Sequence, residues 1–163
     1  MLYKSKKYKD TYQVQFVDYG NQDTVAYSNM RQMPKKLFQF KDQCTKASLA
    51  YVRCCGEEDN CGMKAVEFFN SKTWEQKLMV KPLFKDQNYT YVMLYPRGKQ
   101  QFDSSINYKM VRRGYAKMDA EGFQVPQNLQ GQFTSAQEYA MTKQNGIWKF
   151  GGDFNEAEQD EDY

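Results

Sequence analysis

The sequence contains no histidine among its 163 residues. That absence removes the commonest general base and the usual activator of serine or cysteine nucleophiles, which weighs against catalysis but leaves carboxylate mechanisms open. No apolar run approaches the roughly 18 residues that a membrane-spanning helix needs, and the mean hydropathy is −0.89. Residues 1–7 lack the apolar core of a signal peptide. The sequence therefore predicts a soluble cytoplasmic protein, with the nucleus as a second compartment and no membrane contact.

Cysteine is scarce, with four residues at positions 44, 54, 55 and 61. Cys54 and Cys55 are adjacent, and no Cys-x-x-Cys pair exists, so a zinc site built from these four is possible but poorly spaced. Reduced structural thiols are the favoured interpretation in an intracellular protein. We expect no metal ion and no cofactor.

The net charge of +3 conceals an asymmetry along the chain. Residues 153–163 hold six acidic and no basic side chains, whereas residues 1–152 hold 23 basic and 14 acidic ones. A basic body with an acidic tail suits contact with nucleic acid or self-screening of a basic surface. A solvated surface with a disordered terminus explains the same pattern.

Strand formers and turn residues predict a β-rich α+β chain. Strands are expected at 2–4, 12–18, 24–27, 47–53, 78–84, 89–95 and 115–118. A short helical turn is expected at 28–34, and helices at 64–76, at 105–113 and from an N-cap at Thr134 or Ser135 to Lys143. Residues 54–62 predict a polar surface loop. A small OB-type barrel with helices at its ends accommodates this order, as does a generic α+β domain.

The most informative stretch is Phe16–Asn21, which reads Phe-Val-Asp-Tyr-Gly-Asn. A bend at Tyr19-Gly20-Asn21 would let Phe16 and Tyr19 converge, and two aromatic faces attract a methylated guanidinium by about 0.5–2 kcal/mol each. The Asn21 side chain adds an acceptor for a remaining guanidinium N–H. A plain hairpin with core aromatics fits the same residues.

These residues, followed by Ser-Asn-Met-Arg-Gln-Met-Pro at 28–34, resemble the extended Tudor pattern. Residues 110–117 (Met-Val-Arg-Arg-Gly-Tyr-Ala-Lys) and 136–151 resemble the end of a staphylococcal-nuclease-like OB domain. The acidic ending is similar to the C-terminus of Tudor–staphylococcal-nuclease proteins. The resemblance implies a Tudor β-barrel with its first strands missing at 1–40, joined to an incomplete nuclease-like OB barrel with helices at 41–152. It also implies a disordered acidic tail at 153–163 and a Met1 internal to a longer protein.

In that family the Tudor barrel binds symmetrically dimethylated arginine in an aromatic cage. By resemblance, Phe16 and Tyr19 are cage walls and Asn21 is their polar partner, while the other walls lie on strands that precede this chain. The resemblance implies an adaptor that reads methylarginine in RNA silencing, splicing or transcription co-regulation. Its partners would be methylated ribonucleoproteins, the RNA-induced silencing complex and RNA.

Catalysis is not expected from this region. Cleavage in the nuclease fold needs arginines for the phosphate, carboxylates for a calcium ion and a glutamate base. The acidic motif is absent from 47–62, where Glu57, Glu58 and Asp59 favour a solvated loop.

A second hypothesis is a module that binds single-stranded RNA, with a Tudor part that is only structural. Basic residues mixed with aromatics suit that role. The candidate contacts are Arg97, Lys99, Arg112 and Arg113. On a helix Arg112 and Arg113 would point about 100° apart, so at most one of them is expected to face any single groove.

Overall fold

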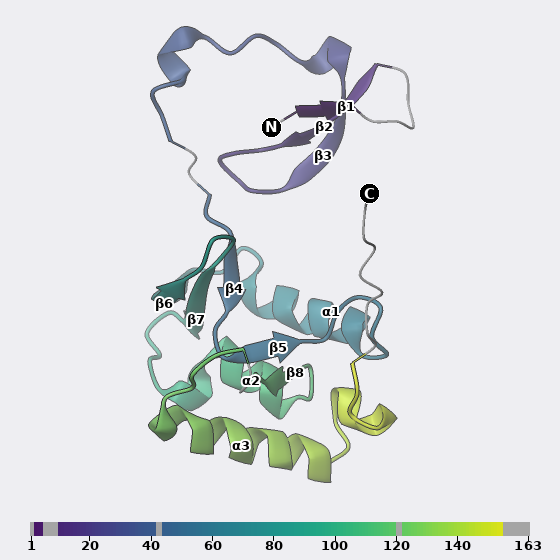
Figure 1. Ribbon diagram of the computed structural model, residues 1–163, viewed down its shortest axis with the longest axis vertical. Helices are drawn as coiled ribbons and strands as arrows, with labels where there is room; N and C mark the ends of the chain where they lie inside the picture. Colours follow the sequence, from purple (N-terminus) through teal and green to yellow (C-terminus); the bar gives the residue numbers. More distant parts are fainter. Residues whose placement is uncertain (1, 5–9, 42–43, 120–121, 155–163) are drawn as a thin grey trace. The chain divides into compact units, whose positions relative to one another are not determined.

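The computed structural model describes residues 2–4, 10–41, 44–119 and 122–154 (Figure 1). The chain forms two compact units. The first consists of residues 1–47 together with 86–90, and the second of residues 48–85 together with 91–163.

The first unit contains a three-stranded antiparallel sheet in the order β1-β2-β3. These strands are Leu2–Lys4, Thr11–Gln15 and Gln22–Ala26. Tyr12 of the central strand lies opposite Lys4 on one side and Val25 on the other. The three predicted strands are thus confirmed, although β2 ends before Phe16. The helical turn expected at 28–34 is a 3-10 turn at Tyr27–Asn29.

The second unit contains the order β4-β7-β6 and a separate pair, β5-β8. The bounds are Ala47–Leu49 (β4), Val52–Cys54 (β5), Leu78–Lys85 (β6), Thr90–Pro96 (β7) and Ala116–Met118 (β8). The prediction of one strand over 47–53 is wrong, because Tyr51 adopts a φ of 65° and separates β4 from β5. The strands in the described part of the chain do not close into either expected barrel.

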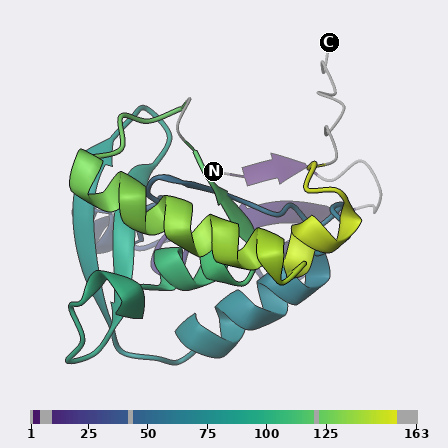
Figure 2. The same cartoon turned by 90° about the horizontal axis from the view of Figure 1, so that it is seen from below.

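Three helices pack around these strands, α1 (Gly62–Thr73), α2 (Ile106–Arg112) and α3 (Gln127–Thr142). The side-chain oxygen of Ser105 accepts the N–H of Tyr108 and caps α2. Figure 2 shows α3 lying along α2. The predicted start of α3 at Thr134 or Ser135 is wrong, since the helix begins seven residues before Thr134, directly after Pro126, whose fixed φ suits a helix start.

The core of the second unit is apolar except for three described residues, the fully buried Asn107 and Ser105 and the buried Ser104. Its largest apolar members with less than 2% exposure are Phe133, Met93, Ile106, Ile147 and Val111. The Asn107 side chain donates to the carbonyls of Ala50 (3.1 Å) and Val92 (3.0 Å) and accepts the N–H of Leu94 (3.1 Å). Because every polar atom of the amide is bonded, its burial joins α2 to the strands without an unpaired group.

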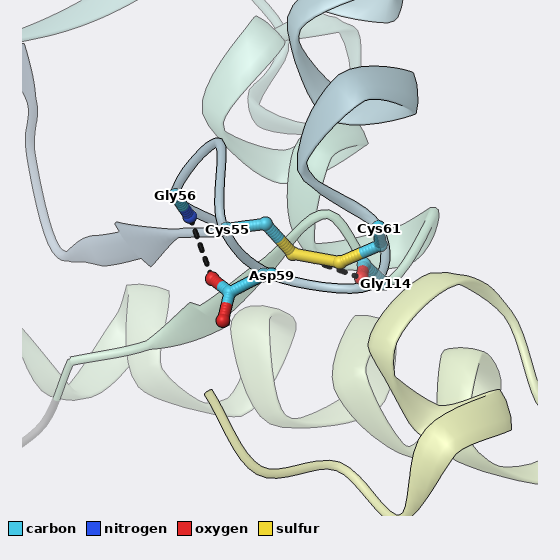
Figure 3. Close-up of a disulfide and its surroundings, with 5 residues drawn as sticks. All are labelled: Cys55, Gly56, Asp59, Cys61 and Gly114. Atoms are coloured by element: carbon cyan, nitrogen blue, oxygen red, sulfur yellow. Dashed lines mark hydrogen bonds between the residues drawn. A yellow bond between two sulfur atoms is a disulfide. The ribbon is translucent and has the colours of Figure 1, made fainter. Parts of the chain in front are cut away.

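The loop that precedes α1 is closed by a disulfide between Cys55 and Cys61, both buried (Figure 3). The Asp59 carboxylate accepts the N–H of Gly56 (2.6 Å) inside the same loop. The expectation that all four cysteines are reduced is therefore wrong for this pair, because the loop returns the two thiols to within bonding distance. Cys44 and Cys54 are free.

No described helix is both long enough and apolar enough to cross a membrane. Of the predicted acidic tail, residues 155–163 lie outside the described residues. Asp153 and Phe154 are described, and both contact Lys117, through a 4.0 Å ion pair and a ring centroid 4.7 Å from Nζ. The predicted domain boundaries at 40 and 152 remain predictions.

Candidate functional site

The predicted methylarginine residues lie in the tight turn between β2 and β3. The N–H of Phe16 donates to the carbonyl of Asn21 (2.9 Å). The carbonyl of Phe16 in turn accepts the N–H groups of Tyr19 (3.2 Å) and Gly20 (2.6 Å). These bonds bring the backbones of Phe16, Tyr19 and Asn21 together at one end of the sheet.

The side chains of this turn face solvent. Tyr19 is 86% exposed, Phe16 is 40% exposed, and Asn21 is also exposed. Isolated exposed aromatics are common on protein surfaces, but here two of them stand three residues apart on one tight turn. The turn can therefore present aromatic faces and an amide to a ligand.

A hollow of about 510 Å³ adjoins the turn in the same unit. Its lining residues are Val17, Asp18, Met33, Leu37, Phe38, Phe40 and Lys41. Neither Phe16 nor Tyr19 lines it, so the predicted ligand residues and the hollow are separate features of the first unit.

The candidate nucleic-acid residues all belong to the second unit, and two of them, Arg112 and Arg113, lie at the C-terminal end of α2. Two hollows adjoin there, which we call the α1–α2 hollow and the α2–α3 hollow, with volumes of about 590 and 330 Å³. The α1–α2 hollow is lined by Phe68, Lys72, Asp103, Tyr108, Lys109, Arg112 and Arg113. The α2–α3 hollow is lined by Arg112, Arg113, Tyr115, Tyr139, Asn145 and Gly146.

Both arginines line both hollows, so the expectation that at most one would face a groove is wrong. The Arg112 guanidinium lies 3.9 Å from the ring centroid of Tyr139, whereas that of Arg113 lies 5.4 Å from the ring of Phe68. The side chains diverge as expected. They nevertheless lie on one surface, because residues three and four positions apart share a helical face, and Lys109 stands three residues before Arg112 and four before Arg113.

The other two candidates behave differently from each other. Arg97 and Lys99 follow β7, and neither residue lines either hollow. The charge of Lys99 lowers the pKa of Lys109, which does line the α1–α2 hollow.

Lys72, Tyr108 and Lys109 were missed by the sequence reasoning. A usable signal was present, since Lys109, Arg112 and Arg113 stand at helical positions i, i+3 and i+4 and so share one face. Lys72 has no such signal, because only tertiary packing brings α1 beside α2. Its Nζ lies 5.5 Å from the ring of Phe68.

Burial lowers the pKa of Lys109 below its ordinary value, and the charges of Lys99 and Lys72 lower it further, while Asp103 opposes them. The hydrogen bond to Tyr108 raises the pKa of the Arg112 guanidinium. In the described part of the chain, no ion pair involves Lys72, Lys109, Arg112 or Arg113. Asp103 is the one carboxylate among the residues that line the two hollows.

Carboxylates do not assemble a metal site in the described residues, where no group of three or more histidine, cysteine, aspartate or glutamate side chains could hold an ion. In the predicted solvated loop, Glu57 and Glu58 are exposed and Asp59 is half-buried.

Two family models match the chain, the Tudor domain over residues 1–51 and the staphylococcal nuclease homologue over residues 39–150. The second match covers more than half of the chain, so this protein belongs to the staphylococcal nuclease homologue family, with a Tudor domain preceding the nuclease-like region.

Its fold is that of an extended Tudor domain. It resembles the extended Tudor domain of Drosophila melanogaster Tudor-SN (p100), with a TM-score of 0.74 and 18% identity over 90% of this chain and 67% of that one. It also resembles the human TDRD1 extended Tudor domain, solved in complex with a symmetrically dimethylated peptide (TM-score 0.59, 20% identity, 69% of this chain and 55% of that one). A curated relative is Ribonuclease TUDOR 2 of Arabidopsis thaliana, 22% identical over 88% of this chain. The chain spans 16% of that relative's length.

Proposed function

We propose that this chain is a methylarginine-reading module, which binds symmetrically dimethylated arginine through Phe16, Tyr19 and Asn21. The observation that carries the proposal is the turn in which the Phe16 carbonyl accepts two backbone N–H groups and leaves Tyr19 86% exposed. A related extended Tudor domain, that of human TDRD1, was solved with a symmetrically dimethylated peptide.

The chemistry of the turn suits such a ligand. A methylated guanidinium keeps its charge but sheds part of its hydration, so aromatic faces attract it more readily than they attract a lysine ammonium. The Asn21 side-chain oxygen can accept the remaining N–H. The module would act as an adaptor in cytoplasmic or nuclear ribonucleoprotein assemblies.

We further propose that this stretch binds rather than cleaves. The curated relative is named a ribonuclease, but the chain spans only 16% of it. The lack of histidine and the Asp59 carboxylate's role inside its own loop support a binding function. Hydrolysis of a labelled oligonucleotide in the presence of calcium, lost in Glu57→Ala, would overturn this part of the proposal.

A calorimetric titration tests the reader function. The ligands are a Gly-Arg peptide with symmetric dimethylarginine, its asymmetric isomer and its unmethylated twin. We expect methyl-dependent binding that weakens by about 2-fold to 30-fold in Tyr19→Ala, which corresponds to one aromatic face of roughly 0.5–2 kcal/mol. Tyr19→Phe keeps the face and should retain binding.

Tyr27→Ala is the matched control, because Tyr27 is 66% exposed on the same unit but lies outside the turn. Equal affinity for methylated and unmethylated peptide would sink the proposal. The same titration on a chain extended toward the N-terminus tests whether residues outside this chain add to the site. Binding by the extended chain alone would show that this chain carries part of the cage.

A further inference from the structure

We propose that Cys55 and Cys61 form a reversible redox site, at which reduction by a dithiol releases the first turn of α1 while the rest of the unit stays folded. The two cysteines stand six residues apart, at the two ends of the loop between β5 and α1. They belong to the second unit, whereas the turn that carries Phe16 and Tyr19 belongs to the first.

The start of α1 has little to hold it apart from the disulfide. Cys61 occupies the N-cap position, where serine, threonine, aspartate or asparagine usually caps a helix. Among the described residues no side chain caps this end of α1, and the first turn contains no acidic residue to favour the helix dipole. The bond to Cys55 therefore takes the place of a cap, because it ties the first turn of α1 to the end of β5.

The loop also keeps its two ends together through its own hydrogen bonds. The Asp59 carboxylate accepts the N–H of Gly56 (2.6 Å), and the Asp59 carbonyl accepts the N–H of Gly62 (2.8 Å). A Cβ at Gly62 would overlap the carbonyl of Gly56, so these two backbone segments lie in contact. Two reduced thiols would stay close to each other, and because closing so short a loop costs little entropy, their bond can form again.

The reduced state has an acceptor for one of the new thiol protons. The sulfur of Cys55 lies 3.9 Å from the backbone carbonyl oxygen of Gly114 (Figure 3). In the disulfide this sulfur carries no hydrogen, whereas the reduced thiol can donate a weak hydrogen bond to that oxygen. The N–H of Cys55 donates to the Tyr115 carbonyl at 2.9 Å in addition. Reduction therefore leaves Cys55 held at the end of β5 and frees Cys61.

The region that reduction loosens is short. Ala65 is buried and donates its N–H to the Cys61 carbonyl at 2.9 Å, which is the first hydrogen bond of the helix. Three residues later the ring of Phe68 packs against Tyr115, with the two centroids 5.5 Å apart. Because that contact does not involve the loop, it holds the remainder of α1 in place.

A dithiol reductant balances the exchange. One thiolate of the reductant attacks a sulfur of the pair, the bond between Cys55 and Cys61 breaks, and a mixed disulfide forms. The second thiol of the reductant displaces that mixed disulfide, so two electrons and two protons pass to the cysteines and the reductant becomes a disulfide. Both cysteines are buried, but residues 56–58 between them are exposed, so a local opening of this loop admits the reductant.

Hydrogen exchange of the full chain, followed by NMR with and without excess dithiothreitol, tests the proposal. We expect the amide of Ala65 to exchange about tenfold or more faster in the reduced chain, because its hydrogen bond to Cys61 opens more often. The amide of Trp74, which bonds the Asn70 carbonyl at the other end of α1, should change by less than about twofold. Transfer into oxidised glutathione should restore slow exchange of Ala65, and peptide mapping should find the original pairing.

Two variants separate this pair from a neighbouring thiol. Cys55→Ser removes the disulfide and keeps Cys61 at the N-cap, so the Ala65 amide should exchange fast with or without reductant. Its melting temperature should lie about 5–10 °C below that of the oxidised natural chain, with unfolding still cooperative. Cys54→Ala is the matched control and should keep the full response. Burial raises the pKa of Cys54 to about 11, and its protonated thiol does not exchange.

Three results would overturn the proposal. The first is a disulfide that dithiothreitol reduces in denaturant but not in the folded chain. The second is equal exchange of the Ala65 amide in the oxidised and reduced chains. The third is loss of protection at Trp74 together with Ala65, which would make the disulfide a support of the whole unit rather than a local switch.

Discussion

The side-chain amide of Asn107 donates a hydrogen bond to the backbone carbonyl of Ala50 at 3.1 Å, across 57 residues of sequence. The same amide bonds Val92 and Leu94, so one buried side chain joins α2 to the strand β7 and to the residue that follows β4. This relationship holds the helix that carries Arg112 and Arg113 in place.

Asn107→Ala should lower the free energy of unfolding by about 3 kcal/mol, because buried backbone groups of Ala50 and Leu94 lose their side-chain partner. Urea denaturation measures the change. Asn70→Ala is the control, since Asn70 is an exposed residue of α1 and its replacement should change stability by less than about 0.5 kcal/mol. Equal effects of the two substitutions would contradict the bridging role of Asn107.

Gly114→Ala should be far more damaging than Gly98→Ala. Both glycines have a positive φ, of 69° and 79°, so each alanine has a backbone cost of about 1–2 kcal/mol. A Cβ at Gly114 would also overlap the backbone carbonyl of Asn145, whereas one at Gly98 meets nothing within 4 Å. Thermal unfolding should show a modest loss for Gly98→Ala and a loss of more than about 3 kcal/mol for Gly114→Ala. Similar melting temperatures would refute the close approach of these two chain segments.

Alkylation at pH 8 should label Cys44 and spare Cys54 in the folded chain. Burial raises the pKa of Cys54 to about 11, so roughly 0.1% of it is thiolate at that pH. Mass spectrometry counts the labels. Denaturant alone should add Cys54, and denaturant with a reductant should add Cys55 and Cys61, which form the disulfide. Labelling of all four cysteines without reductant would show that Cys55 and Cys61 are not joined by a disulfide.

Lys99→Gln should raise the pKa of Lys109, because it removes a neighbouring positive charge that disfavours the protonated ammonium. Asp103→Asn should lower that pKa, since the carboxylate favours the charged form. Lysine side-chain NMR follows both titrations, with Lys81→Gln on the exposed part of β6 as the control. Because folding depresses this pKa, the unfolded chain binds the proton more tightly. The contribution of Lys109 to stability therefore grows as pH rises through the folded pKa toward 10.5.

The sequence predicted those elements whose signals are local. The hairpin of β6 and β7 follows from strand formers around a polar turn, and Ser105 is a side chain suited to cap α2. Tyr51 was misjudged, because a run of strand formers conceals a residue with positive φ. That bend depends on distant contacts, among them the N–H of Asp119, which donates to the Tyr51 carbonyl.

The start of α3 was missed because its first turns contain weak helix formers. Asn128 and Gly131 lower the helix propensity, while Thr134 offers a more familiar cap. The helix forms there because Phe133 and Ala136 are fully buried in the core. The residues around α2 could be predicted only in part. Helical spacing places Lys109 on the same face as the two arginines, whereas Lys72 belongs to α1 and comes near them only through tertiary packing.

The division of the chain into units has a genetic consequence. The polypeptide passes from one unit to the other three times, after Ala47, after Lys85 and after Thr90. The Asp86–Thr90 turn, whose Thr90 N–H donates to the Lys46 carbonyl, is therefore encoded inside the second unit but built into the first. No single splice site or recombination point could transfer one unit intact to another gene.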